Sequence, residues 1–389
     1  MKTYKRLFDR VCSFGNLHTA YRRARRGKRD KAEVIGFDFD QEKEIIRLES
    51  ELSDGSYRPG EYRSFYIYEP KRRVISAAPF RDRVVHHAIC NVIEPIFEER
   101  FIFDSYACRK NKGSHKALDR YTRYSRQFSH VLKADIVQYF PSVDHDALMA
   151  LLEKRITDRS LMDLMAMIVS GGKDVFRDEY RMVYFPGDDL FAALRPRGLP
   201  IGNLTSQFFA NIYLDPLDHF VKEELRIPAY IRYCDDFVVF GNDRSSLEDV
   251  RNAIDGFLRD FRLVLHPRKS VIFRVKDGVP FLGFLIFPDH RLLLHRSVTR
   301  AGRRLRETAE EYADGLISEE DVRQRVMAWL GHVSHGDTWK LRKKLLSGCV
   351  FRSGGNDAGD TDIRKDVRLE PVDFPEDGRF SEPVPAFSD

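Results

Sequence analysis

Hydrophobic and polar positions along the chain follow two different periods. Apolar residues recur at helical spacing in QEKEIIRLESELS (41–53) and in DRVVHHAICNVIEPIFEERF, where Asp82 is the expected N-cap. The same spacing predicts further helices over 112–124, 145–156, 160–171, 245–261, a long helix from about residue 203, and most of 300–350.

Shorter apolar, β-branched and aromatic runs, some of which alternate with polar residues, predict strands elsewhere. YRSFYIYEPKRRVISAAP alternates on both sides of Glu69-Pro70-Lys71 and therefore predicts a β-hairpin. Because helices mix with antiparallel pairs, the expected class is α+β rather than a doubly wound parallel sheet. Further strands are expected over 130–140, in a hairpin over 230–241, and over 270–275 and 280–287.

Composition narrows the class of protein. A chain of 389 residues suggests two or three subdomains. No apolar run is long enough to predict a membrane span, and the N-terminus lacks the apolar core of a secretory signal. Five scattered cysteines without a Cys-x-x-Cys pair argue against a zinc module and a disulfide framework. These features predict a reducing, cytoplasmic location without a membrane partner.

Charge is unevenly distributed along the chain. The net charge is +5, yet residues 354–389 hold ten acidic and four basic residues, so the remainder carries +11. We expect the basic clusters at 22–31, 71–73 and 300–306 to meet phosphates, although such clusters can also be solvated faces. The acidic tail has few apolar residues and is predicted to be disordered.

The candidate chemistry lies in three aspartates. Asp235 and Asp236 stand between two apolar runs in YIRYCDDFVVFG, where they are either an acidic hairpin turn or a pair held to bind cations. Asp135 lies in the apolar stretch VLKADIVQYF, where an unpaired buried carboxylate would be costly. If the two segments are neighbours, three carboxylates converge. Two Mg²⁺ ions would relieve their repulsion and suit phosphoryl transfer.

These segments resemble reverse transcriptases over about residues 60–350. The resemblance rests on PKRRVISAAPFRDRVV, SYACRKNKGSHKAL, VLKADIVQYFPSVDH, GLPIGNLTSQFFANIYLDPLD, the YCDD hairpin, LVLHPRKSVIF and FLGFLIF, in the order of that family. It implies a right-hand polymerase fold with fingers, an antiparallel-sheet palm and a helical thumb. The implied domains are a basic helical extension (1–60), fingers (61–129), palm with finger insertions (130–295), thumb (296–350) and an acidic tail (351–389).

The resemblance also implies a role for each matching residue. Asp135, Asp235 and Asp236 match the catalytic, metal-binding acids, with the Ile136 carbonyl as a further ligand of two Mg²⁺ ions, which Mn²⁺ can replace. Phe140 occupies the position of the steric gate against ribonucleotides, although it can also be read as a core aromatic. FLGFLIF would be the primer-grip strand. The remaining nucleotide-binding candidates are Lys71, Arg73, Ile201, Gln207 and Lys269.

One departure points to a subtype. LPIGNLTSQ has Ile201 where related bacterial enzymes have a glutamine that contacts the incoming nucleotide. An apolar group there predicts lower fidelity, because discrimination through hydrogen bonds is lost. This pattern, with FGNLHTAYRRARRGKR and WLGHVSHGDTWKL, resembles the reverse transcriptases of diversity-generating retroelements. That resemblance implies a structured template RNA, a primer, dNTPs, error-prone cDNA and a basic accessory protein.

Other interpretations remain open. A defence-associated bacterial reverse transcriptase would share the same polymerase motifs, and a non-catalytic RNA-binding scaffold would share the basic charge but would not need three acids. We expect neither a group II intron maturase nor an RNase H domain, because the chain leaves no room for further domains after residue 350. Phosphate loops of the Walker type, GxSxG elbows and HExxH helices are absent from the sequence.

Overall fold

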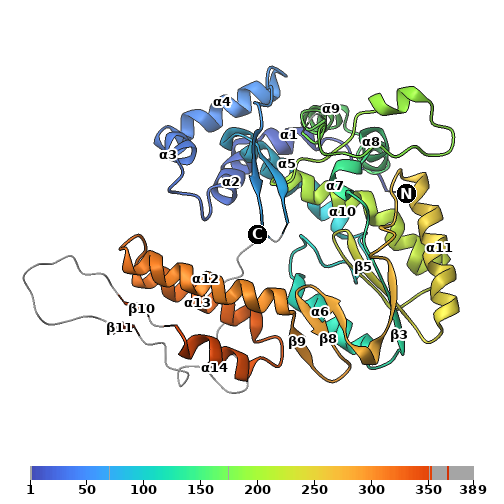
Figure 1. The fold of residues 1–389 in the computed structure, drawn as a ribbon. Coiled ribbons are helices and arrows are strands. Elements are labelled where there is room, and N and C mark those ends of the chain that lie inside the picture. The colour runs from blue at the N-terminus through green and yellow to red at the C-terminus, as the bar shows by residue number, and fades with distance from the viewer. Residues whose placement is uncertain (1, 70, 174, 350, 353–365, 368–389) are drawn as a thin grey trace, which may run out of the picture. The chain divides into compact units, whose positions relative to one another are not determined.

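The structure is a computed structural model that describes residues 2–69, 71–173, 175–349, 351–352 and 366–367 (Figure 1). It divides into two compact units. Unit 1 holds residues 1–113 and 131–272, and unit 2 holds residues 114–130 and 273–389. The prediction of a disordered acidic tail falls almost entirely outside the described residues.

The N-terminal part of unit 1 is a group of helices around one central helix, drawn in blue in Figure 1. Each helix buries its apolar stripe, as the fully buried Leu17, Ile45, Leu48, Val84 and Ile89 show. Burial of such side chains contributes roughly 1.5–3 kcal/mol each. The helices are α1 (Phe8–Cys12), α2 (Phe14–Ala24), α3 (Ala32–Phe39), α4 (Gln41–Ser53) and the central α5 (Phe80–Glu98).

The start of α5 corrects one prediction. The N-cap is Pro79 and not Asp82, which lies in the first turn of the helix. Asp82 is buried, and its carboxylate accepts hydrogen bonds from the Tyr57 hydroxyl (2.7 Å) and the Gly60 amide (2.8 Å). Its position is therefore set by a tertiary contact that the helical period does not reveal.

The predicted hairpin at 62–79 is confirmed as β1 (Arg63–Ile67) and β2 (Arg73–Ala77), paired antiparallel. Its second strand is fixed to the segment before α10 (Leu204–His219). Buried Asn203 accepts a hydrogen bond from the Ala78 amide (3.1 Å) and donates one to the Ser76 carbonyl (2.8 Å). The Ser76 amide in turn donates to the Ile201 carbonyl (2.8 Å).

A four-stranded sheet in the order β4-β5-β3-β6 follows. Its strands are β3 (His130–Ala134), β4 (Tyr230–Tyr233), β5 (Asp236–Gly241) and β6 (Val271–Arg274). The predicted hairpin at 230–241 is confirmed, with β4 and β5 paired antiparallel. The other elements of unit 1 are α7 (Tyr139–Ser142), α8 (His145–Glu153), α9 (Arg159–Ser170), the 3₁₀ helix η1 (Leu190–Leu194), the π-helical turn η2 (Phe220–Glu224) and α11 (Arg244–Asp260).

The strand predicted over 130–140 is too long. It ends at Ala134, and Gln138 adopts a left-handed conformation (φ 45°) before the short helix α7 begins. Ile136, beyond the end of the strand, is buried nonetheless and still pairs with Leu265 in an isolated bridge. The apolar stretch over 130–140 therefore does not indicate the length of the strand.

Unit 2 joins a small antiparallel sheet to a group of helices. PFLGFLIF is a hairpin and not the single strand that was expected, because Leu282 and Gly283 turn the chain with φ values of 44° and 90°. No helix among the described residues of either unit is long and apolar enough to cross a membrane. The elements are α6 (Ser114–Ser125), η3 (Val275–Asp277), β7 (Val279–Phe281), β8 (Phe284–Ile286), β9 (Arg291–Leu293), α12 (His295–Ala313), α13 (Glu319–Val333), α14 (Trp339–Ser347), β10 (Phe351–Arg352) and β11 (Asp366–Val367).

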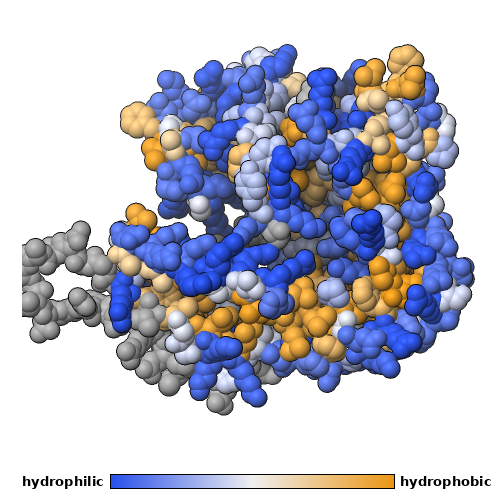
Figure 2. Space-filling model, in the orientation of Figure 1, coloured by the Kyte–Doolittle hydropathy of each residue, from blue (hydrophilic) through white to orange (hydrophobic). Residues whose placement is uncertain are grey.

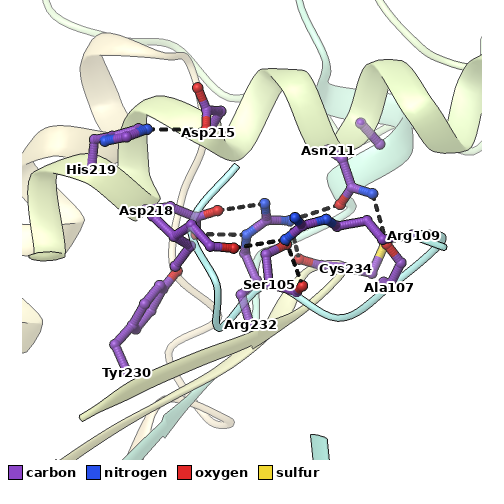
Figure 3. Close-up of polar contacts among 12 residues, drawn as sticks. Ser105, Ala107, Arg109, Asn211, Asp215, Asp218, His219, Tyr230, Arg232 and Cys234 are labelled. Carbon is purple, nitrogen blue, oxygen red and sulfur yellow. Dashed lines mark hydrogen bonds and ion pairs between the residues drawn. The ribbon is translucent and has the colours of Figure 1, made fainter. Parts of the chain in front are cut away.

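A buried ion pair lies beneath the β4–β5 hairpin (Figure 3). Arg232 on β4 and Asp218 on α10 are both fully buried, and the guanidinium binds the carboxylate through Nε (2.7 Å) and a terminal nitrogen (2.6 Å). The Tyr230 hydroxyl donates to the same carboxylate (2.8 Å), and Arg232 also donates to the Asn211 side chain (3.0 Å). The network joins helix α10 to strand β4 at fixed geometry.

The same guanidinium reaches the hairpin turn. It donates to the Cys234 carbonyl at 3.2 Å, directly before Asp235 in the chain. The backbone of Arg232 is held as well, since its amide donates to the Asp104 carbonyl and its carbonyl accepts from the Tyr106 amide, both at 2.9 Å. The ion pair therefore fixes the backbone position of the turn that carries the adjacent acids.

We expect Asp218→Asn to destabilise unit 1 severely. The change leaves the Arg232 guanidinium buried without a counter-charge, which costs about 3–5 kcal/mol when one partner of a buried pair is removed. Urea unfolding of the full chain at pH 7 measures the difference. The matched control is Glu248→Gln, the same acid-to-amide change in a pair whose Arg244 and Glu248 side chains are 68% and 44% exposed. Equal losses of stability in the two variants would contradict the prediction.

Candidate active site

The three predicted acids are brought to one edge of the four-stranded sheet. Asp135 follows the last residue of β3, Asp235 is the second residue of the turn between β4 and β5, and Asp236 begins β5. Strands β3 and β5 are neighbours in the sheet. The charges of Asp236 and Asp135 both contribute to the raised pKa of Asp235, so all three acids lie within electrostatic reach of one another at this end of the strands.

The hairpin turn is tight. Tyr233 pairs with Asp236, which leaves only Cys234 and Asp235 as the connecting residues. Two-residue hairpin turns require positive φ at one or both of these positions, and Cys234 supplies it with φ 57°. A non-glycine residue in this conformation is uncommon. The hydrogen bond from Arg232 to the Cys234 carbonyl holds the strained residue in place.

The pKa values of Asp235 and Asp236 are both raised. Burial, followed by the charges of Asp236 and Asp135, raises the pKa of Asp235 to about 6. Burial also raises the pKa of Asp236, although the positive charges of Lys133, Lys269 and Lys71 oppose the shift. A divalent cation at this edge would favour the ionised form of both groups.

Lysine side chains near the three acids offset part of their negative charge. The Lys269 ammonium donates to the Asp135 carboxylate. Lys269 is positioned by the segment after α11, since the His266 amide donates to the Asp135 carbonyl at 2.7 Å and the Lys269 amide to the His266 carbonyl at 3.1 Å. Lys71, from the chain between β1 and β2, acts on both Asp236 and His266. Of the predicted residues, Lys269 therefore contacts Asp135, and Lys71 lies within electrostatic reach of Asp236.

The backbone of Ile136 faces away from its bridge partner. In its bridge with Leu265, the hydrogen bonds are made by the residues on either side, Val137 amide to Val264 carbonyl (2.9 Å) and His266 amide to Asp135 carbonyl (2.7 Å). The Ile136 amide and carbonyl therefore point away from Leu265. Because its side chain is a buried hydrocarbon, only the main-chain carbonyl of Ile136 could bind an ion.

Other predicted nucleotide-binding residues lie on neighbouring elements of unit 1. Phe140 is half-buried on α7, packs against the core, and meets Tyr139 edge to face with ring centroids 5.5 Å apart. Arg73 is exposed at the start of β2, and Ile201 lies before α10, where its carbonyl accepts from Ser76. The Gln207 side chain accepts a weak hydrogen bond from the Cys108 thiol (3.4 Å). In the described residues, no hydrogen bond or ion pair joins Arg73 or Gln207 to the acids.

The donor set fits Mg²⁺ without forming a closed cage. Within the part of the chain that the structure describes, no group of three or more His, Cys, Asp or Glu residues could hold a metal ion by itself. Mg²⁺ keeps several waters and binds through one or two carboxylates together with substrate phosphates. Hard carboxylate oxygens with raised pKa values suit such an open site, to which a nucleotide would contribute the remaining ligands.

Sequence reasoning missed two contributors. Lys133 is the first of the positive charges that act on Asp236, and its position two residues before Asp135 places both on one face of the strand segment, a signal that the period of two provides. Arg232 lies within the predicted hairpin, where the sequence pattern indicates no role for it. Its partner Asp218 is fourteen residues away on a helix, so no local pattern indicates the pair.

Comparisons with known proteins identify the family of the chain. Residues 68–286 match the family model described as reverse transcriptase (RNA-dependent DNA polymerase). Protein YkfC of Escherichia coli K12 is 28% identical over 295 residues, which cover 65% of this chain and 72% of that protein. The group II intron-encoded protein LtrA of Lactococcus lactis is 27% identical over 358 residues, covering 74% of this chain.

The present chain spans only 56% of the length of LtrA. Among solved structures, apo telomerase from Candida tropicalis superposes with a TM-score of 0.41 and 11% identity, covering 59% of this chain and 48% of that one. The family model covers more than half of the chain and includes all three acids at the sheet edge. The chain therefore belongs to the reverse transcriptase family of RNA-dependent DNA polymerases.

Proposed function

We propose that the chain copies a structured template RNA into DNA, with Asp135, Asp235 and Asp236 as its catalytic acids. The observation that carries this proposal is the meeting of three carboxylates at one sheet edge, where burial and mutual repulsion raise the pKa of Asp235 to about 6. A protein that only bound RNA would gain nothing from such a concentration of negative charge.

The proposed cofactor is a pair of Mg²⁺ ions, which Mn²⁺ can replace. Asp135 and Asp235 would hold both ions, with Asp236 and the Ile136 carbonyl as further ligands. When bound, the ions would supply the positive charge that activates a primer hydroxyl and stabilises the leaving pyrophosphate. The Lys269 ammonium, which contacts Asp135, would then be free to donate a proton to the departing group.

The remaining residues would bind and select the nucleotide. Lys71 and Arg73 lie at the tip of the β1–β2 hairpin, where their positive charges would hold the triphosphate of a dNTP. Phe140 would place its ring against the sugar and exclude a 2′-hydroxyl. In this scheme, residues 61–129 act as fingers, 130–295 as palm and 296–350 as thumb, with 1–60 as a basic extension and 351–389 as a tail.

The proposed biological role is the production of error-prone cDNA for targeted sequence diversification. Ile201 supports it, because an apolar side chain replaces a hydrogen-bonding group beside the proposed nucleotide site. The partners would be the template RNA, a DNA primer and a basic accessory protein. The second candidate role, phage defence, uses the same polymerase chemistry and would leave the fidelity ordinary.

Extension of a DNA primer on a defined RNA template tests the polymerase. We expect Mg²⁺-dependent and dNTP-dependent cDNA that EDTA abolishes and Mg²⁺ or Mn²⁺ restores. Asp235→Asn should reduce the rate by more than about 100-fold, because loss of a ligand exceeds the effect of losing an outer hydrogen bond to a metal site. Glu248→Gln is the control for an acid-to-amide change on the surface. Undiminished extension by Asp235→Asn would refute the catalytic assignment.

Sequencing of the products tests the diversification role. Wild-type cDNA should contain errors concentrated opposite template adenines, and Ile201→Gln should lower their frequency by roughly 3- to 10-fold, the worth of one added hydrogen bond. Ile201→Leu, which keeps the site apolar, should leave the error frequency unchanged. Accurate wild-type cDNA would exclude this role and favour phage defence.

A further inference from the structure

The chain between α9 and α10, together with Pro141, lines a cavity that is open to solvent and does not include the three acids. Its volume is about 390 Å³. The segment leaves α9 at Gly171, runs through the 3₁₀ helix η1 and returns to the start of α10 at Leu204. The cavity is lined by Pro141, Lys173, Phe176, Arg177, Tyr180, Ala193, Leu194, Arg195, Pro196 and Arg197.

The lining of this cavity is basic. Four of the ten lining residues are Lys or Arg, and none is acidic. Lys173 and Arg177 are exposed and make no ion pair with a described residue. Arg197 lies over the Tyr180 ring, 4.2 Å from its centroid, and donates only to backbone carbonyls. Among ion pairs between described residues, Arg195 is the member of this set that has carboxylate partners, Asp144 (2.9 Å) and Asp146 (3.7 Å). Three positive charges are therefore available to an anion.

The walls of the cavity are fixed to the body of unit 1. The Gly198 amide donates to the Val143 carbonyl (2.8 Å), and the His145 amide to the Pro196 carbonyl (3.1 Å). Gly198 adopts φ 101°, and a Cβ there would approach the Phe176 ring to 3.3 Å. Such a position suits glycine, which allows the chain to close against the ring. The site is preformed, and binding would require little ordering of its backbone.

Apolar side chains stand beside the charges. Leu190, Phe191 and Leu194 on η1 are 83%, 74% and 78% exposed, and hydrophobic surface is visible over this segment at the upper right of Figure 2. Tyr180 and Phe176 add aromatic rings inside the cavity. Positive charge interleaved with aromatic and apolar groups is the pattern of single-strand binding, in which phosphates meet cations and bases stack on side chains.

We infer that this cavity binds one phosphate-bearing nucleotide unit of a single-stranded RNA, at a site separate from the three acids. Its volume lies at the low end of the range for small-molecule sites and suits one nucleotide rather than a duplex. Pro141 in its lining belongs to α7, the helix that also carries Phe140, so the strand would be held beside the proposed nucleotide site. The assignment of the nucleotide to an RNA strand rests on the proposed function. The cavity and its positive charge are observed independently of that function.

The test is a binding measurement without chemistry. Fluorescence anisotropy of a labelled single-stranded oligouridylate is recorded with the full chain over a range of KCl, without divalent metal or dNTPs. Lys173→Gln/Arg177→Gln should weaken binding and reduce the slope of log K against log salt by about 1.4, since each phosphate contact to a single strand contributes about 0.7. The control Lys154→Gln/Arg159→Gln removes two exposed positive charges of the same unit away from the cavity and should change the slope far less.

The source of the nucleotide is decided by competition and crosslinking. Unlabelled RNA, but not uridine monophosphate, should displace the probe, and RNA with 4-thiouridine should crosslink within 173–181 or 193–197. Displacement by the mononucleotide at equal concentration would support the pocket and assign it to a free nucleotide. Equal salt slopes for the two double variants, with crosslinks confined to other segments, would overturn the inference. Because no extension is measured, a failure of the polymerase assay does not affect the result.

Discussion

The ion pair of Arg232 and Asp218 is the constraint on which the candidate site depends. Neither charge can be left alone in the interior, so the two side chains fix helix α10 against strand β4. The guanidinium also donates a hydrogen bond to the Cys234 carbonyl. Through this bond the pair sets the turn that presents Asp235 and Asp236. A buried charge thus positions two charges at the edge of the sheet.

At the end of the strands where the three acids meet, the negative charges repel one another, and neighbouring lysines offset only part of this repulsion. Burial raises the pKa of Asp235 and of Asp236, and the charge of Asp135 adds to both shifts. Lys269 contacts Asp135, while Lys133 and Lys71 act on Asp236 from other elements. These lysines reduce the repulsion without replacing divalent cations, which bring two charges each and accept several oxygen ligands. In the proposed function, ions that arrive with a phosphate-bearing substrate would supply the remaining positive charge.

Much of this arrangement could be predicted from the sequence, for identifiable reasons. The hairpin at 230–241 and the helix at 41–53 have strong periodicity, and the pairing of Asp135 with the YCDD turn follows from the cost of a lone carboxylate in an apolar stretch. The end of β3 could not be predicted, because it depends on the left-handed Gln138. The partners of Arg232 and Asp82 come from distant elements, and no local period reports such contacts.

Binding of Mn²⁺ to the metal-free full chain, followed by its electron paramagnetic resonance signal, tests the central claim that these acids form a divalent-metal site. The titration is made with a dNTP and without it, on wild type, Asp135→Asn/Asp235→Asn and Glu248→Gln. The account predicts saturable binding that the dNTP strengthens, that Glu248→Gln retains, and that the double variant loses by at least about 10-fold. Equal Mn²⁺ affinity in the double variant and wild type would contradict it.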